Sequence, residues 1–262
     1  MGALGRRHRG AAPGLPPAHR LPHDLSPGGP ALGSGSSDGL LLRHGAVLLA
    51  GGRSSRMGRP KALVRVGDSA MVARVARALE DACSELVVVL SASPGGESAD
   101  EDALRGALAS GAFAATRGAL RFVRDALPEL GPVAGLAAGL AASRAELVLV
   151  APCDLPFLSG ALIRGLFARA DCAPPPDVVA VRRGGFWEPL PAVMRRETMA
   201  RVYAEQVARG ELRPTAAWPA LRVSAVDEAA LASLDPTGAS FEGVNDPAEL
   251  EAARARLART SG

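Results

Sequence analysis

The residues of this sequence that are best suited to chemistry lie in one short stretch, LAGGRSSRMGRPKAL, from Leu49 to Leu63. The stretch contains three arginines and Lys61, which is the only lysine in a chain with 30 basic residues. The guanidinium of Arg56 can bind phosphate oxygens in a fork, whereas the compact ammonium of Lys61 suits a single oxygen. Three glycines let the backbone turn tightly and expose its N–H groups: Gly51, Gly52 and Gly58. The stretch therefore predicts a phosphate-binding loop, although it is neither a Walker A motif nor GxGxxG. The alternative is a flexible basic loop between a strand and a helix.

A second candidate is Asp154, in the segment PCDLP (152–156) that follows the apolar run ELVLV. A carboxylate at a strand end is a hard oxygen ligand, and Mg²⁺ prefers one or two carboxylates together with substrate phosphates. A turn or helix-capping aspartate would look the same in the sequence, so both interpretations stay open. Pro152 and Cys153 are interpreted as structural.

The third candidate is Asp125, which ends an apolar run and is followed by ELGPVAGLAAG. Gly131, Pro132 and Gly135 begin a segment of small residues. Small side chains allow a flat ring or another backbone to approach closely, and they equally allow tight packing of a helix on a sheet. The two interpretations are compatible.

The elements that must position these residues alternate along the chain. Short apolar runs predict strands at 45–50, 85–91, 120–125, 146–152 and 177–181. Segments of helical length and spacing lie between them at 69–82, 131–143 and 159–170. This alternation predicts an α/β fold with a doubly wound, mainly parallel sheet and helices on both faces. Ligands bind beyond the carboxyl ends of the strands in such sheets, and all three candidates lie there.

The last third of the chain is less regular. Residues 190–194 and 221–226 are interpreted as strands around a helix at 195–210. A further helix is predicted after Asp246, which can cap it, with Pro247 in the first position and Glu249 completing a capping box.

Composition excludes several classes of function. All four histidines lie in residues 1–44, so histidine-dependent triads, His–Zn sites and histidine general bases are excluded from the rest. Outside residues 1–44 the basic and acidic residues balance, and aromatic content is 3%, which argues against nucleic acid as a partner. No apolar run is long enough to span a membrane. Three cysteines without metal-ligand spacing predict reduced thiols and a cytoplasmic protein.

Residues 1–44 are rich in glycine and proline and lack apolar periodicity. They predict a disordered extension or a mis-assigned start, followed by a single domain over 45–260.

The three loops together resemble the molybdenum cofactor guanylyltransferase family, within the nucleotidyltransferases. The resemblance covers about residues 45–258. The family pattern LAGGxSxRMGxxK is matched by Leu49, Ala50, Gly51, Gly52, Ser54, Arg56, Met57, Gly58 and Lys61. The segments Asp125…GPVAGL and PCDLP resemble the family's Asp…GPLAGL and PCDxP.

The sequence departs from the family at three places. The family often has Asn near the end of the second strand, where this chain has Leu90 and Ser91. The family's NVNTP is GVNDP here, with Gly243 replacing the first Asn and Asn245, the only Asn in the chain, retained. The run Trp187-Glu188-Pro189-Leu190 stands where the family usually has a shorter polar residue before Pro-Leu.

The resemblance implies a Rossmann-like nucleotidyltransferase domain that transfers GMP from GTP to the terminal phosphate of molybdopterin and releases pyrophosphate. It implies that Lys61, Arg56 and Asp154 are catalytic and that Asp154 holds Mg²⁺. The implied nucleotide contacts are Leu49, Ala50, Gly51, Gly52, Lys61, Asp125 and Asp154. The implied acceptor-side residues are Gly131, Pro132, Gly135 and Asn245. The partners are GTP and molybdopterin or the molybdenum cofactor, with molybdoenzyme-maturation proteins as further candidates.

Three alternatives remain at the level of sequence. The first is a molybdenum cofactor cytidylyltransferase using CTP. Gly51 and the GPVAGL segment argue against it, and related cytidylyltransferases tend to have LAAG at the position of LAGG. The second is a sugar-1-phosphate nucleotidylyltransferase, in which Asp246 would be a second metal ligand. The third is a non-catalytic, nucleotide-binding regulatory domain, against which the presence of Lys61, Arg56 and Asp154 argues.

Overall fold

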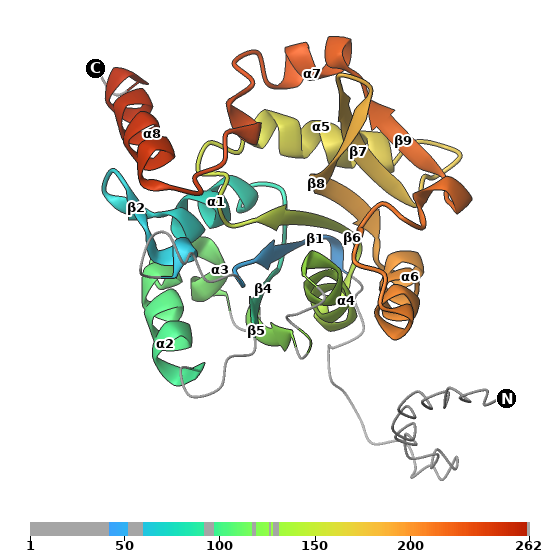
Figure 1. The fold of residues 1–262 in the computed structure, drawn as a ribbon, viewed down its shortest axis with the longest axis horizontal. Coiled ribbons are helices and arrows are strands. Elements are labelled where there is room, and N and C mark those ends of the chain that lie inside the picture. The colour runs from blue at the N-terminus through green and yellow to red at the C-terminus, as the bar shows by residue number, and fades with distance from the viewer. Residues whose placement is uncertain are drawn as a thin grey trace, which may run out of the picture. The chain divides into compact units, whose positions relative to one another are not determined.

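A mixed sheet of seven strands organises the part of the chain that the computed structural model describes, which is residues 42–51, 60–91, 97–116, 119–125, 127 and 131–260 (Figure 1). The strand order is β5-β4-β1-β6-β8-β7-β9. The strands are β1 (Leu42–Leu49), β4 (Leu86–Ser91), β5 (Leu120–Asp125), β6 (Ala145–Pro152), β7 (Val178–Arg183), β8 (Phe186–Arg195) and β9 (Val223–Val226). Only β8 runs antiparallel to its neighbours β6 and β7, so the predicted mainly parallel α/β sheet is confirmed.

The connections between the strands create a switch point at the centre of the sheet. From β1 the chain proceeds outward through β4 to β5, and it then crosses back over β1 to form β6 on the other side. Helices on the two sides of such a point diverge, so the carboxyl ends of β1 and β6 border the place where open α/β sheets bind ligands.

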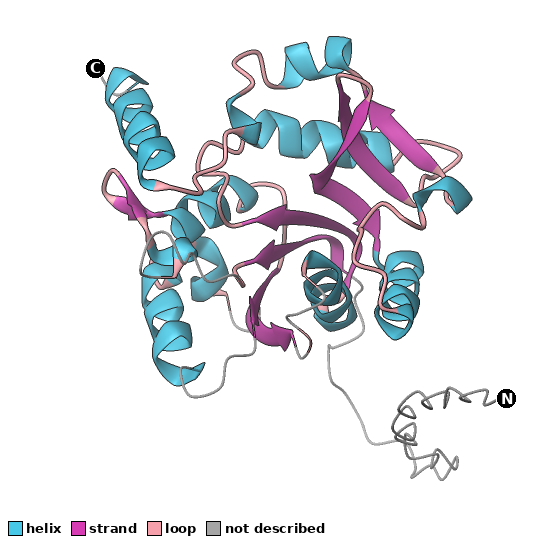
Figure 2. Cartoon of the chain, viewed as in Figure 1, coloured by secondary structure: helices cyan, strands magenta, loops and turns pink. Residues whose placement is uncertain are grey.

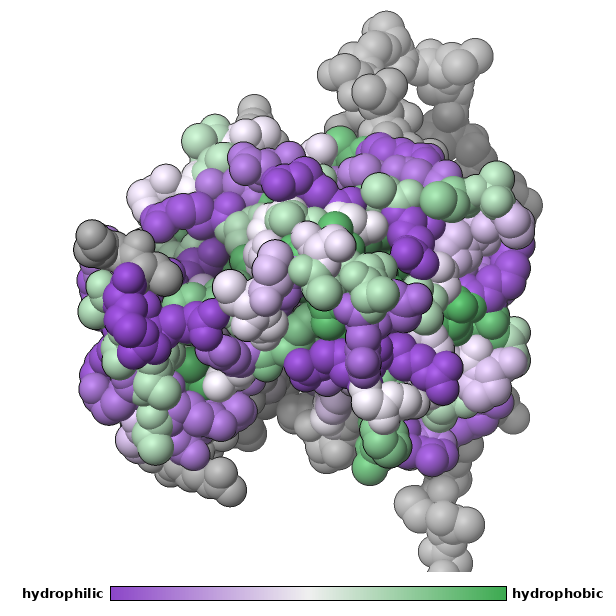
Figure 3. Space-filling view, turned by 90° about the horizontal axis from the view of Figure 1, so that it is seen from above, coloured by the Kyte–Doolittle hydropathy of each residue, from purple (hydrophilic) through white to green (hydrophobic). Residues whose placement is uncertain are grey.

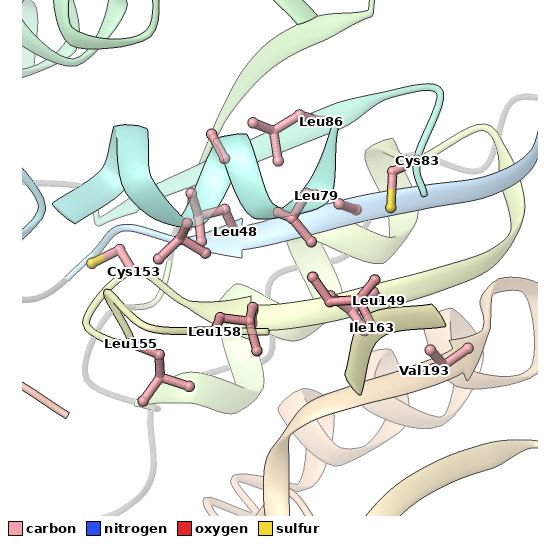
Figure 4. Close-up of a cluster of buried hydrophobic side chains, with 14 of the residues drawn as sticks. Leu48, Leu79, Cys83, Leu86, Leu149, Cys153, Leu155, Leu158, Ile163 and Val193 are labelled. Atoms are coloured by element: carbon pink, nitrogen blue, oxygen red, sulfur yellow. The ribbon is translucent and has the colours of Figure 1, made fainter. Parts of the chain in front are cut away.

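Both faces of the sheet are covered by helices (Figure 2). Buried side chains of one face pack against α1 (Met71–Leu79), α2 (Glu97–Leu108) and α5 (Gly160–Ala170). Part of this core is drawn in Figure 4, where Leu79, Ile163 and Leu48 come from α1, α5 and β1. The other face packs against α4 (Pro132–Ala142) and α6 (Arg196–Arg209), which also pack on each other. Burial on both faces explains why the central strands are apolar along almost their whole length.

Small residues bring α4 unusually close to the sheet. A Cβ at Gly139 would lie 2.4 Å from Cγ1 of Val47 and 2.9 Å from Cγ2 of Val89, so only glycine fits there. The helix begins after Gly131, whose φ of 59° is unfavourable for other residues, and Pro132 takes its first position. The tight helix–sheet packing considered for GPVAGLAAG is therefore present.

Several boundaries differ from the sequence-based expectation. Strand β1 begins at Leu42 instead of Gly45, so it includes His44, whose ring stacks on Phe167 at 4.1 Å between centroids. The prediction that the folded domain contains no histidine is therefore wrong, because His44 belongs to β1. His44 lies near the amino end of β1, beside Leu147, and no histidine follows it in the sequence.

One predicted helix is shorter in the structure, and three helices among the described residues were not predicted. The helix predicted at 69–82 is α1, and Ser69 and Ala70 instead form β3 (Ser69–Ala70), paired with β2 (Arg65–Val66). Additional helices are α2, α3 (Ala112–Ala115) and α7 (Glu228–Leu234). The predicted C-terminal helix is α8 (Pro247–Thr260). Residues 1–41 lie outside the described residues.

The described surface carries few large apolar side chains. Those that are exposed are Leu127, Phe186 and Leu212. Figure 3 shows one face, on which hydrophilic residues surround smaller hydrophobic areas. Among the described residues, none of the helices has the length and apolar character that crossing a bilayer requires.

Candidate active site

The predicted site loops follow strand ends that lie at one edge of the sheet. Leu49 at the end of β1 is paired with Pro152 at the end of β6. On the other side, Ser91 at the end of β4 is paired with Asp125 at the end of β5. The loop after each strand therefore starts at the same edge, as the sequence predicted.

Gly51 follows β1 and packs against the end of β4. A Cβ at this position would lie 2.4 Å from Oγ of Ser91 and 2.9 Å from its backbone nitrogen. The close approach of two strand ends is thus one reason for glycine here, in addition to the predicted exposure of loop N–H groups. Ala50 also joins these strands, because its N–H donates to the carbonyl of Val89 at 2.9 Å.

Lys61 joins two of the predicted site residues that are distant in sequence. It opens the short 3₁₀ helix η1 (Lys61–Leu63), and its Nζ donates to Oδ2 of Asp154 in an ion pair. The same Nζ donates to Oδ1 of Asn245 at 2.6 Å. The side chains of Lys61 and Asp154 are only 17% and 21% exposed. The structure therefore brings the lone lysine and the lone asparagine of the chain together around Asp154.

The side chain of Asp154 does not cap the helix that follows it. That role belongs to Ser159, whose Oγ accepts from the N–H groups of Ala161 and Leu162 at the start of α5. The backbone carbonyl of Asp154 accepts from the N–H of Val244 at 3.0 Å, which fastens the segment containing Asn245 to the end of β6. The helix-cap interpretation of Asp154 is therefore wrong, whereas the residue does lie in a turn, with its carboxylate in contact with Lys61.

The oxygen donors of this cluster suit a hard cation. Asp154 contributes a carboxylate and Asn245 an amide oxygen, both of which are ligands that Mg²⁺ accepts. Within the described part of the chain, no group of three or more His, Cys, Asp or Glu residues could hold a metal ion. A cation here would thus take most of its ligands from substrate phosphates and water, which is the usual arrangement for Mg²⁺.

Cys153, next to Asp154, is not a nucleophile. Burial and, second, the charge of Asp154 raise the pKa of its thiol to about 12, although Lys61 opposes the shift. The thiol is therefore protonated near neutral pH and unreactive. Burial similarly raises the pKa of Cys83 to about 12. All three cysteines are free thiols, as predicted.

Asp125 lies buried at the end of β5, with 5% of its surface exposed. Its Oδ1 accepts from the N–H of Leu127 at 2.8 Å, so it shapes the loop that leads to α4. A Cβ at Gly135 would lie 3.3 Å from Cδ2 of Leu49 and 4.0 Å from Oδ2 of Asp125. The first turn of α4 is thus set between two predicted nucleotide contacts, with the partial positive charge of its amino end at the same edge.

The remaining predicted site residues lie in different segments of the chain. Gly131 and Pro132 start α4, and the side-chain oxygen of Asn245 accepts from Nζ of Lys61. Arg56 and Gly52, with the rest of 52–59, lie outside the described residues.

The side chain of Glu249 accepts from a backbone N–H that lies one residue before the one the sequence predicted. Asp246 caps α8 as predicted, because its Oδ1 accepts from the N–H of Glu249 at 2.9 Å. The carboxylate of Glu249 does not complete the box on Asp246 and instead accepts from the N–H of Asn245 at 2.5 Å. The capping-box pattern identified the pair of residues, but the exact backbone partner depends on how the preceding chain enters the helix.

The sheet with its switch point and the polar cluster at the carboxyl ends of β1 and β6 define a nucleotidyltransferase, and comparisons with known proteins agree. The model of the MobA-like NTP transferase domain matches residues 46–221. A probable molybdenum cofactor guanylyltransferase from Pelotomaculum thermopropionicum is 32% identical over 214 residues, which are 82% of this chain and 93% of that protein. One from Natronomonas pharaonis is 32% identical over 80% of this chain and 96% of that protein.

A solved structure has the same fold. The molybdopterin-guanine dinucleotide biosynthesis protein A of Archaeoglobus fulgidus superposes with a TM-score of 0.63 at 20% identity, over 82% of this chain and 98% of that one. The chain belongs to the MobA-like family of molybdenum cofactor guanylyltransferases and is a nucleotidyltransferase.

Proposed function

We propose that this protein transfers GMP from GTP to the terminal phosphate of molybdopterin, or of its molybdenum-loaded form, and releases pyrophosphate. Membership of the family supports the class of reaction. The observation that carries the proposal is the cluster in which Lys61 contacts both Asp154 and Asn245 at the switch point of the sheet.

The reaction needs no general base. A terminal phosphate oxygen of the acceptor attacks the α-phosphorus of GTP, a new P–O bond forms, and the bond to the oxygen bridging to the β-phosphorus breaks. The attacking oxygen is already ionised near neutral pH, so no proton has to be removed from it. The protein must align the two phosphates and neutralise the charge that develops between them. A site without histidine is sufficient for that task.

Lys61 is suited to the neutralising role because the described residues accept only two of its three donors. An ammonium group carries three N–H donors, of which Asp154 and Asn245 accept two. The third can be donated to a phosphate oxygen while the other two keep the side chain in place. Arg56 and the N–H groups of the loop from Gly51 to Gly58 are proposed to bind the leaving pyrophosphate.

Asp154 is proposed to hold Mg²⁺ together with the nucleotide phosphates. A bound Mg²⁺ ion would supply charge neutralisation on the phosphate oxygens. Asp154 lies close enough to Lys61 for both to act on one phosphate group, so the carboxylate orients the lysine as well as offering an oxygen to the metal.

Guanine is the proposed base. Its N1–H and 2-amino group are adjacent donors that one carboxylate can accept together, and the buried Asp125 is proposed to contact either the base or the ribose. Because adenine and cytosine lack this pair of donors, a site built in this way would reject them strongly.

Release of pyrophosphate tests the proposal directly. GTP and CTP would each be supplied with and without Mg²⁺, and with and without molybdopterin or its molybdenum-loaded form. We expect release only from GTP, only with Mg²⁺ and only when the pterin is present. Release from CTP would contradict the base choice and indicate a cytidylyltransferase. Nucleotide binding without release would indicate the regulatory alternative.

A contact of Asp246 favours the proposed function over the sugar-1-phosphate alternative. That alternative would need Asp246 as a second metal ligand, whereas Oδ1 of Asp246 accepts from the N–H of Glu249 at the start of α8. This contact supports the interpretation of Asp246 as a helix cap.

A further inference from the structure

A small hydrophobic core at the C-terminus joins the three segments that carry the polar cluster. We call it the α8 core, and its buried members are Val64, Val66, Met71, Val244, Leu250 and Ala253. Phe157 and Leu257 pack against it. The α8 core is separate from the two larger cores that cover the faces of the sheet.

Each polar residue of the cluster lies close in sequence to a member of this core or to a residue that packs against it. Lys61 is three residues before Val64, Asp154 is three residues before Phe157, and Asn245 directly follows Val244. Packing in the α8 core therefore fixes the backbone from which all three polar side chains extend. Close-packed protein interiors transmit small displacements, so the α8 core sets the separation of the three polar side chains.

Close contacts show that α8 is fitted to the segment that carries Lys61. A Cβ at Gly67, in the turn between β2 and β3, would lie 2.4 Å from Cδ2 of Leu257. The guanidinium of Arg254 donates to the carbonyl of Arg65 at 3.3 Å. Helix α8 and the β2–β3 hairpin thus pack as one unit behind Lys61.

Hydrogen bonds then lead from α8 to the lysine. The carboxylate of Glu249 accepts from the N–H of Asn245 at 2.5 Å, and Oδ1 of Asn245 accepts from Nζ of Lys61 at 2.6 Å. Glu249 can therefore hold the backbone of Asn245 so that its side-chain oxygen meets the ammonium group.

We propose that Glu249 is a positioning residue for Lys61, and that α8 is the element through which it acts. The proposal rests on the proposed function, in which Lys61 binds a phosphate of the nucleotide. Without Glu249, Asn245 can turn away and Lys61 is oriented by Asp154 alone. Its third donor then no longer points consistently at the phosphate.

The first test uses the fact that Lys61 is the only lysine in the chain. Protein labelled with ¹³Cε-lysine, and carrying no added lysine, gives one lysine side-chain signal in an NMR spectrum. We expect Glu249→Ala to move this signal, and Glu249→Gln, which keeps an acceptor oxygen, to restore most of its position. Arg259→Ala is the matched control, because Arg259 lies on the same helix and is exposed. An unmoved signal in Glu249→Ala would overturn the inference.

The second test is a double-mutant cycle on kcat/KM for GTP. We expect Glu249→Ala to lower kcat/KM about 10- to 100-fold, the scale of a small misplacement in a site. In a Lys61→Ala background the same change should cost within about twofold, because the residue through which Glu249 acts is gone. An equal loss in both backgrounds would contradict the proposed route through Lys61.

Asn245→Ala keeps both capping residues of α8 and gives a second cycle if Glu249→Ala unfolds. It should likewise be non-additive with Lys61→Ala, and additive losses would overturn the inference. Glu249→Ala could also move the lysine signal although the wild-type protein does not use GTP. That result would support the link between Glu249 and Lys61 and would refute the proposed function. The two failures are therefore distinguishable.

Discussion

Lys61 is the residue around which the site is built, and its contacts explain why the chain has a lysine there. An ammonium group directs three donors tetrahedrally, so it can serve a carboxylate, an amide oxygen and a phosphate at once. A guanidinium is planar and suits two parallel acceptors in one plane. The carboxylate of Asp154 and the amide of Asn245 come from different segments and accept two of these donors, and we propose that the third binds the nucleotide.

Replacing Lys61 tests this explanation. We expect Lys61→Ala to lower the rate of nucleotidyl transfer on the order of 10²–10³-fold, the usual loss when one charged contact to a transition state is removed. Lys61→Arg keeps the charge but not the donor geometry, and we expect it to recover only part of the rate. Steady-state kinetics with GTP would measure both. Full recovery by arginine would show that charge alone matters.

Replacing Asp154 separates its proposed metal role from its pairing with Lys61. Asp154→Asn keeps an oxygen acceptor for Lys61 but lacks the negative charge, and we expect a loss of transfer rate on the order of 10²–10³-fold. If the carboxylate holds Mg²⁺, the variant should also require more Mg²⁺ for half-maximal rate. An unchanged Mg²⁺ dependence would assign Asp154 to orienting Lys61 only.

At the scale of elements, packing at strand ends determines where the loops begin. Gly51 lets the end of β1 approach the end of β4, and Gly135 and Gly139 let α4 lie close to the same two strands. Residues at this edge are therefore constrained by packing.

Alanine substitution at two glycines should therefore have opposite effects on stability. We expect Gly51→Ala to lower the free energy of unfolding by about 1–3 kcal/mol, because its Cβ would overlap Ser91. At Gly106, within α2, a Cβ meets nothing within 4 Å, and Gly106→Ala should raise stability by about 0.5–1 kcal/mol. Urea denaturation would measure both. Equal effects would show that Ser91 moves away freely, and Ser91→Gly should relieve part of the loss at Gly51.

The sequence predicted the strands and α4 well because their burial leaves strong patterns. It did not predict α2, because half of the residues in its segment ESADEDALRGAL are charged or polar; the helix buries Leu104 and Leu108. The three loops were identified from unusual residues at strand ends. The contact of Lys61 with Asn245 was not, because these residues are 184 positions apart and are brought together by tertiary contacts, which include the packing of α8 and the hydrogen bond between Val244 and Asp154.

At the scale of the whole described fold, the two edges of the sheet have different roles. The carboxyl edge carries the polar cluster, and the amino edge carries a buried network around Glu85, which is 1% exposed. Its carboxylate pairs with Arg121 and accepts from Oγ of Ser143 at 2.6 Å. It also accepts from the N–H of Ala145 at 3.0 Å. One side chain thus ties β4, β5 and the start of β6 together, far along the strands from the reacting groups.

This division predicts that the amino edge can be damaged without changing the chemistry. We expect Glu85→Ala to lower the free energy of unfolding by about 3–5 kcal/mol, because it leaves the charge of Arg121 and several N–H groups without their partner. Because that loss is a large part of an ordinary domain's stability, Glu85→Gln, which keeps acceptor oxygens, provides a milder variant. Denaturant unfolding would measure both.

The matched control is Glu146→Ala at the same edge. Glu146 pairs with Arg43 and Arg195, but its side chain is 40% exposed, so its loss should cost about 0–1 kcal/mol. For all three variants, kcat per folded molecule should stay near the wild-type value below the unfolding transition. A selective fall of kcat in folded Glu85→Gln would show that strain at the amino edge reaches Lys61 and Asp154 through the strands, and the separation of roles would then be wrong.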